Sequence, residues 1–278
     1  MLSPVFHNDG WVDAAAIPLD DPAVVQGVTL VETFRLYDGR VFEPLRHEPR
    51  LRAGPDYLQL DWFPRGLDPF ALVQDLADRL PRDLGDAAAV LLITPGREQP
   101  TVICHARPLP SYDAWLTRGV PLVIPNVRQD RSLPRTFKHR SRLHWWKADQ
   151  QAKATNPDAL AWLLDHDDVL TETSVGNIVA VRGDRLLHAP ADRVVPGITA
   201  GIIAELADDL GLTSETEPLT RESLRAVDEL WMTSTGCGVA PIASVDGIAL
   251  ERRTMYDRIR DSWDAYTSRS RSSRSPGT

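Results

Sequence analysis

Short apolar runs separated by turn signals dominate the first hundred residues, a pattern typical of strands. Residues 28–36 (VTLVETFRL) are apolar and β-branched enough to predict a strand. Asp38-Gly39 is a tight-turn signal, so residues 40–42 are expected to return as the second strand of a hairpin. Residues 88–94 and 101–105 predict two buried strands around a turn at residues 95–96.

Helical signals lie between these strands. Residues 46–52 predict the opening of a helix, in which Pro49 is tolerable only in the first turn. Asp68 is an N-cap candidate followed by a proline, and apolar residues then recur at helical spacing to Leu80. The stiff sequence of residues 107–111 (RPLPS) predicts an extended linker.

The second half of the chain has its own alternation of strands and helices. A polar loop over residues 126–135 is expected to deliver Lys138 to the start of a helix, which Asn156-Pro157 stops after about residue 154. A second helix should end at Gly211. The predicted strands are 120–124, 159–164, 169–172, 177–181 and 229–233, and the later helices are 200–210 and 221–227.

These elements predict an α/β (α+β) protein of two domains. A chain of 278 residues is long enough for one large or two medium domains. We expect a small N-terminal α/β domain over residues 1–106, a linker over 107–119 and a larger C-terminal domain over 120–266. Residues 267–278 are rich in Ser and Arg and are expected to be disordered.

Composition narrows the functional classes. The net charge of −8 argues against a general nucleic-acid binder. The two cysteines, Cys104 and Cys237, have neither a metal-site nor a disulfide spacing, so no metal is expected. The N-terminus lacks a basic region followed by an apolar core, and no apolar run reaches membrane-helix length. We therefore expect a cytoplasmic protein without a membrane partner.

Lysine is rare in this chain. Of 31 basic side chains only three are lysines, Lys138, Lys147 and Lys153. Arginine carries charge and forked hydrogen bonds, but only lysine offers a primary amine that can lose its proton and attack a carbonyl. All three are equally rare, so rarity alone does not separate a reactive amine from a surface lysine.

Four further features suit chemistry together with Lys138. Glu172 ends an otherwise apolar strand. The sequence Pro196-Gly197-Ile198-Thr199 opens a helix, where backbone N–H groups favour a phosphate. Ser234 and Thr235 could add donors to that anion, and Arg50 a forked cation. Taken alone, Glu172 also fits an exposed strand end, residues 196–199 an ordinary helix start, and Arg50 a solvated arginine. Together, amine, carboxylate and phosphate nest are the groups that hold pyridoxal 5′-phosphate.

Seven blocks in order make the chain, from about Gly27 to Gly247, resemble the class IV aminotransferases. These are fold-type IV pyridoxal-phosphate enzymes and include branched-chain aminotransferases, D-amino-acid aminotransferases and 4-amino-4-deoxychorismate lyases. The blocks are Gly-x-x-x-x-Glu-Thr-x-Arg at 27–35, the Asp38-Gly39 hairpin, His47-x-x-Arg50-Leu51, Lys138-His139-x-x-Arg142-Leu143, Thr171-Glu172 with Asn177, Pro196-Gly197-Ile198-Thr199, and Asp228-Glu229-Leu230 leading into Thr233-Ser234-Thr235.

The resemblance implies roles for individual residues. Lys138 would be the Schiff-base lysine and proton shuttle, and Glu172 the partner of the pyridine nitrogen. It also implies a cofactor in a cleft between the domains and an active site completed in a homodimer. The implied cofactor-binding residues are Arg50, Lys138, Glu172, Gly197, Ile198, Thr199, Ser234 and Thr235.

The reaction stays open among three alternatives. Glu32 resembles the aminotransferases, which implies exchange of an amino group between a small amino acid and a 2-oxo acid. His139 with Arg142-Leu143 resembles the aminodeoxychorismate lyases, which release pyruvate and 4-aminobenzoate. The third alternative is a non-catalytic member of the fold. The candidate substrate-pocket residues are Val31, Glu32, Thr94, Arg107 and Asn177.

Overall fold

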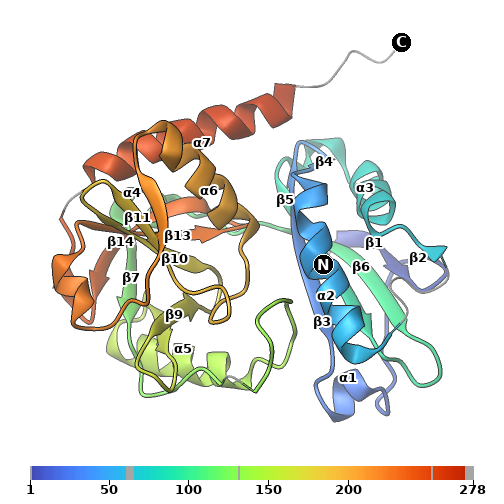
Figure 1. Cartoon of the computed structure of the whole chain (residues 1–278). Coiled ribbons are helices and arrows are strands. Elements are labelled where there is room, and N and C mark those ends of the chain that lie inside the picture. Colours follow the sequence, from blue (N-terminus) through green and yellow to red (C-terminus); the bar gives the residue numbers. More distant parts are fainter. Residues whose placement is uncertain (1, 61–65, 131, 252, 273–278) are drawn as a thin grey trace. The chain divides into compact units, whose positions relative to one another are not determined.

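The computed structural model describes residues 2–60, 66–130, 132–251 and 253–272, which form two compact units (Figure 1). The first unit contains residues 1–110, 136–141 and 268–278, and the second contains residues 111–135 and 142–267. The change of unit after Pro110 falls inside the linker expected from the sequence. A short stretch around Lys138 joins the first unit although its chain neighbours belong to the second.

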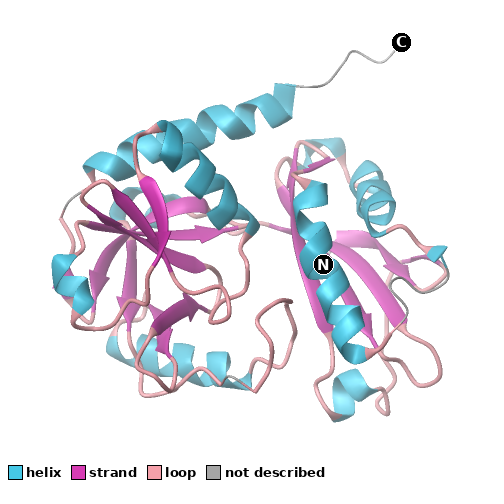
Figure 2. Cartoon of the chain, in the orientation of Figure 1, coloured by secondary structure: helices cyan, strands magenta, loops and turns pink. Residues whose placement is uncertain are grey.

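The first unit is built on a six-stranded antiparallel sheet with the order β2-β1-β6-β5-β3-β4 (Figure 2). The strands are β1 (Leu2–His7), β2 (Gly10–Val12), β3 (Leu30–Tyr37), β4 (Arg40–Val41), β5 (Ala87–Thr94) and β6 (Thr101–Pro108). The helices are α1 (Pro22–Val25), η1 (Pro44–His47), α2 (Glu48–Leu58), α3 (Pro69–Arg79) and η3 (Arg82–Leu84). The hairpin and both longer helices therefore form where the sequence pattern predicts them.

The core of this unit lies between the sheet and helices α2 and α3. Alternate residues of β3 are buried, among them Leu30, Phe34 and Leu36, and they join a cluster with the apolar stripe of α3. Asp68 accepts hydrogen bonds from two backbone N–H groups of the first turn of α3, as an N-cap residue does. Glu32 occupies the remaining inward position of β3, so a carboxylate lies on an otherwise apolar buried face.

The second unit is built on a sheet that closes on itself. Its strand order is β12-β11-β10-β13-β14-β7-β8-β9, and β9 also pairs with β10 through Glu172 and Asn177. The strands are β7 (Val120–Val123), β8 (Leu160–Leu164), β9 (Leu170–Thr173), β10 (Asn177–Arg182), β11 (Arg185–His188), β12 (Thr213–Thr216), β13 (Glu229–Ser234), β14 (Gly238–Val245) and β15 (Ile248–Ala249). Two residues that the sequence analysis selected thus face each other at the closure of a barrel.

Helices surround the barrel. They are α4 (Asp113–Arg118), α5 (Leu143–Thr155), α6 (Ile198–Asp209), η4 (Ser223–Ala226) and α7 (Thr254–Ser272). Trp162, Leu170, Met232 and their neighbours fill one core. In a second core, Trp145 and the other apolar residues of α5 pack with Ala161 and Leu163 of β8. Among the described residues, no helix combines the length and apolar character needed to cross a bilayer.

Helix α5 begins later than the sequence predicted. The expected helix opens at Lys138, whereas α5 starts at Leu143. The cause is competition from strand β3, because the Val31 N–H donates to the Lys138 carbonyl at 3.0 Å and the Arg140 N–H donates to the Thr29 carbonyl at 2.8 Å. Residues 138–140 are therefore extended and pair with the start of β3.

The end of the chain also differs from the expectation. Residues 267–272 were expected to be disordered, but α7 continues to Ser272; residues 273–278 lie outside the described residues. Tyr256, Ile259, Trp263 and Thr267 recur at helical spacing and are buried, and this stripe sustains the helix through its polar end.

Candidate active site

Lys138 lies beside the charged residues of the first unit. Its pairing with β3 places it next to Val31 and close enough to Glu32 to lower that carboxyl's pKa. Glu32, Arg50 and Lys138 line the same small pocket, whose apolar wall includes Leu51 and Phe137. Three residues chosen from separate sequence motifs therefore meet in one place.

Arg50 binds Glu32 with a two-pronged ion pair. Its Nε donates to Glu32 Oε2 at 2.8 Å and its Nη2 donates to Oε1 at 2.6 Å. Both side chains are at most 4% exposed. His47, one turn before Arg50, places Nδ1 3.1 Å from Glu32 Oε1, and its ring packs on Phe34. Parallel hydrogen bonds between a guanidinium and a carboxylate fix the plane of both groups.

The ionisation of this cluster follows from its burial and its charges. Burial raises the pKa of the Glu32 carboxyl, but Arg50, His47 and Lys138 outweigh it, so the net pKa lies well below its ordinary value. Burial lowers the pKa of the His47 imidazole more than Glu32 raises it, so His47 is neutral near pH 7. A neutral His47 must carry its hydrogen on Nδ1 to donate to the Glu32 carboxylate.

In the second unit, Glu172 is held by a backbone N–H and an amide. The Val195 N–H donates to Glu172 Oε2 at 3.1 Å, and Asn177 Nδ2 lies 3.4 Å from the same oxygen. Asn177 Nδ2 also donates to the Val195 carbonyl at 2.9 Å. Glu172 is only 7% exposed, so this carboxylate is not the solvated strand end of the simpler interpretation.

Two arginines add positive charge around Glu172. Burial lowers the pKa of the Arg135 and Arg142 guanidinium groups, and the charge of Glu172 partly offsets that effect in both. Arg142 Nη2 donates to the Ser174 carbonyl in the turn after β9. Both guanidinium groups therefore lie close enough to Glu172 to interact with its charge.

The start of α6 is formed by the predicted Gly197-Ile198-Thr199 sequence. Gly197 is the N-cap residue, and a Cβ added to it would lie 2.0 Å from Asn177 Oδ1. Glycine is therefore required by the close approach of Asn177 rather than by an unusual φ. With no capping side chain at Gly197, the N–H groups of the first turn, including those of Ile198 and Thr199, meet the requirements of an anion site.

The remaining candidates lie in varied surroundings. Ser234 Oγ accepts from the Cys237 N–H at 3.2 Å, which fixes the turn that also carries the partly exposed Thr235. Thr94 is fully buried, where it donates to Asp21 Oδ2 at 3.0 Å and accepts from the Gly96 N–H. Arg107 is exposed on β6. The substrate-pocket roles of Thr94 and Arg107, like that of Asn177, stay predictions.

Comparisons with known proteins bear on this set of residues. Residues 29–245 match the family described as amino-transferase class IV. The chain belongs to this family. Family membership confirms the resemblance found in the sequence and, with it, pyridoxal 5′-phosphate, the cofactor of the class IV aminotransferases.

The similar proteins include both aminotransferases and a lyase. A putative branched-chain-amino-acid aminotransferase of Methanocaldococcus jannaschii is 28% identical over 90% of this chain and 90% of its own. The aminodeoxychorismate lyase of Bacillus subtilis is 26% identical over 85% of this chain and 83% of its own. The solved branched-chain aminotransferase of Thermoproteus uzoniensis has a TM-score of 0.84 at 22% identity, over 97% of this chain and 96% of its own. This likeness confirms the two-domain α/β fold class.

Several residues around the candidate site had no signal in the sequence analysis. Gln129, Arg135 and Arg193 were not selected, and His47 was selected only as a motif residue. Arg135 and Arg193 are two arginines among 28, and Gln129 lies in a polar loop. Glu32 did carry a usable signal, because it stands at an inward position of a strand whose other inward residues are apolar.

Proposed function

We propose that this chain is a pyridoxal-phosphate aminotransferase that moves an amino group between a small amino acid and a 2-oxo acid. The observation that carries the proposal is the buried Glu32–Arg50 ion pair in the pocket that Lys138 lines. A buried charge pair is costly to maintain for stability alone. An amine beside a fixed guanidinium suits a ligand that carries both an aldehyde and a phosphate.

The residues present fit the cofactor by their chemistry. Lys138 would attach it covalently, and Glu172 would pair with its ring nitrogen. Arg50, whose orientation is set by its two hydrogen bonds to Glu32, would add positive charge at its phosphate. The first turn of α6, which has no capping side chain, and the Ser234–Thr235 turn would supply further donors.

The proposed chemistry gives each side chain a separate task. When bound, pyridoxal 5′-phosphate supplies an electron sink for the negative charge that develops at the substrate Cα. Lys138 Nζ accepts the proton that leaves the substrate Cα and delivers it again later in the exchange. The Val195 N–H and Asn177 hold the Glu172 side chain in one orientation. Glu32 keeps Arg50 in one orientation, so the anchor is formed before the ligand binds.

A second candidate is an aminodeoxychorismate lyase. The observation that favours it is the Lys138-His139-x-x-Arg142-Leu143 motif, together with the named lyase among the relatives. In this alternative the residues that hold the cofactor keep the same tasks. Only the fate of the substrate differs, because pyruvate is eliminated instead of an amino group being exchanged.

Reconstitution with pyridoxal 5′-phosphate tests the proposal. We expect a coloured protein whose cofactor becomes fixed to Lys138 after borohydride reduction and peptide mapping, whereas Lys147→Ala labels normally and Lys138→Ala does not. An amino donor alone should convert the absorbance of an aminotransferase to that of the amine form of the cofactor. Release of pyruvate only from aminodeoxychorismate would select the lyase, and absence of any cofactor adduct would refute both enzymes.

Two further properties belong to this proposal. We expect a homodimer in the cytoplasm that acts on small amino acids and keto acids. Size-exclusion chromatography with light scattering tests the dimer, because a dimer of 30.9 kDa subunits is readily separated from a monomer. Elution as a monomer in the presence of cofactor would contradict it.

A further inference from the structure

A connection between β11 and α6, residues 189–197, supplies the hydrogen bond that holds Glu172. Val195, near its end, provides the N–H that reaches Glu172 Oε2 at 3.1 Å. The position of this N–H depends on how firmly residues 189–197 are fixed to the rest of the unit. Residues that fix this connection therefore also fix the orientation of the Glu172 carboxylate.

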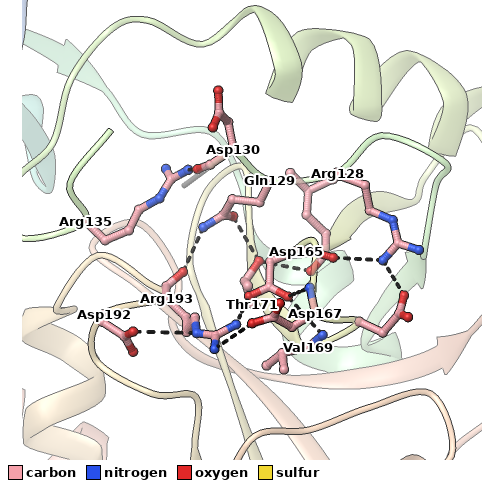
Figure 3. Close-up of polar contacts among 12 residues, drawn as sticks. Arg128, Gln129, Asp130, Arg135, Asp165, Asp167, Val169, Thr171, Asp192 and Arg193 are labelled. Atoms are coloured by element: carbon pink, nitrogen blue, oxygen red, sulfur yellow. Dashed lines mark hydrogen bonds and ion pairs between the residues drawn. The ribbon is translucent and has the colours of Figure 1, made fainter. Parts of the chain in front are cut away.

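Polar contacts on Arg193, two residues before Val195, anchor the connection (Figure 3). The guanidinium of Arg193 binds the buried Asp165, and its Nη2 lies 3.0 Å from Asp167 Oδ2. The carbonyl of Arg193 accepts a hydrogen bond of 2.7 Å from Gln129 Nε2. The side chain of Arg193 thus binds the β8–β9 turn, while its backbone binds Gln129.

Gln129 also binds the strand that carries Glu172. Because the Arg193 carbonyl can only accept, Gln129 Nε2 must face it, and Oε1 therefore faces Thr171. The Thr171 hydroxyl lies 2.9 Å from Oε1 and also 2.9 Å from the Leu163 carbonyl, so its one hydrogen is shared between two acceptors. Gln129 is 1% exposed, so both ends of its amide are satisfied within the protein.

The position of Thr171 separates this bridge from the ligand side of Glu172. Successive side chains of a strand point to opposite faces, so Thr171 and Glu172 leave β9 in opposite directions. Gln129 therefore holds β9 from the face opposite to the carboxylate. Gln129 links Thr171 of β9 to the connection at Arg193, and the Val195 N–H links the connection back to Glu172 of β9. These contacts form a closed ring around Glu172.

We propose that Gln129 is a positioning residue for Glu172: by joining Thr171 of β9 to the Arg193 carbonyl, it keeps the Val195 N–H on the Glu172 carboxylate. The inference about the hydrogen bond stands on the geometry of the second unit alone. Its consequence for the cofactor rests on the proposed function, in which Glu172 pairs with the ring nitrogen.

The first test needs no cofactor. In full-length protein labelled with [15N]valine, the Val195 amide signal is assigned by its loss in Val195→Ile. We expect Gln129→Met, which removes both hydrogen bonds at similar volume, to speed exchange of this amide roughly tenfold and to shift its signal toward its position in Glu172→Gln. Gln151→Met is the matched control, because Gln151 Oε1 accepts from the Asn126 N–H in the same loop region and stands outside the ring around Glu172.

Thr171 gives an independent pair of variants. Thr171→Val keeps the shape but removes the hydroxyl, with its contacts to Gln129 and to the Leu163 carbonyl, and should speed exchange of the Val195 amide at least as much as Gln129→Met does. Thr171→Ser keeps the hydroxyl and should restore the wild-type amide. This pair also decides the matter if Gln129→Met fails to fold. Unchanged exchange and shift of the Val195 amide in Thr171→Val would overturn the inference.

The second test uses the reconstituted protein. We expect Gln129→Met and Thr171→Val to bind pyridoxal 5′-phosphate about tenfold more weakly, to change the pH profile of its visible absorption, and to lower kcat while KM for the donor stays near that of Gln151→Met. If wild type forms no coloured adduct, the proposed function fails, and the amide test still decides the bridge. Equal affinity and equal pH profiles in Gln129→Met and Gln151→Met would overturn the positioning role.

Discussion

The Glu32–Arg50 pair allows a sharp test of the buried cluster in the first unit. Glu32→Gln preserves shape but removes the charge that Arg50 binds through two hydrogen bonds of 2.6 and 2.8 Å. Removing one partner of a buried ion pair costs about 3–5 kcal/mol, because the other charge stays buried without compensation. Gln keeps one oxygen acceptor for Arg50, so we expect a loss of about 3 kcal/mol in the free energy of unfolding.

Chemical denaturation at pH 7, followed by tryptophan fluorescence, measures this loss. The matched control is Glu48→Gln, which removes an exposed ion pair with Arg52 one turn away on the same helix. Exposed pairs of this kind contribute about 0.3–0.5 kcal/mol. The control should therefore leave the unfolding free energy nearly unchanged.

The stability difference between wild type and Glu32→Gln should also depend on pH. The pKa of Glu32 in the folded protein is lowered below its ordinary value of 4.5, so its stabilisation is present above that pH and is lost as the pH falls toward the folded value. A glutamine at position 32 does not titrate and has no such dependence. The stability gap between wild type and Glu32→Gln should therefore narrow below about pH 4.5. A gap as small as that of Glu48→Gln at pH 7 would refute the reasoning.

Other variants test further contacts. Gly197→Ala should destabilise the start of α6 and weaken cofactor retention, because its Cβ would lie 2.0 Å from Asn177 Oδ1. The Cβ of Gly201→Ala meets nothing within 4 Å, so this control should raise the free energy of unfolding by up to about 1 kcal/mol, measured by thermal unfolding. Glu229→Gln should cost about 2 kcal/mol in denaturant titrations, because the carboxylate accepts two backbone N–H groups at the start of α7. Burial lowers the pKa of His188, so below pH 6.5 protonation favours the unfolded chain; His188→Leu should reduce this loss of stability on acidification.

Local signals explain what the sequence predicted correctly. The β3–β4 hairpin follows from Asp38-Gly39, and α3 from Asp68 with its following proline, because each depends on residues within one turn. The Gly197-Ile198-Thr199 helix start was found for the same reason. Lys138 and Glu172 were candidates by residue type and position, and the family resemblance implied their roles.

Long-range pairing explains what could not be predicted. The start of α5 was misplaced because residues 138–140 pair with β3, more than a hundred positions earlier in the chain. The parallel pairing of β7 with β14 in the barrel, which joins Val120 to Ile242, has no local signal either. Gln129 is one polar residue in a polar loop until folding places it between Thr171 and Arg193.

The pairing of residues 138–140 with β3 has a consequence for how this protein is made. During synthesis the Thr29–Val31 edge of the first unit emerges long before the segment that covers it, and unpaired strand edges recruit other chains. A fragment that ends at Pro110 would keep this edge open and would lack Lys138. Any exchange of the first unit between relatives therefore has to carry residues 136–141 with it, although they lie in the sequence of the other half.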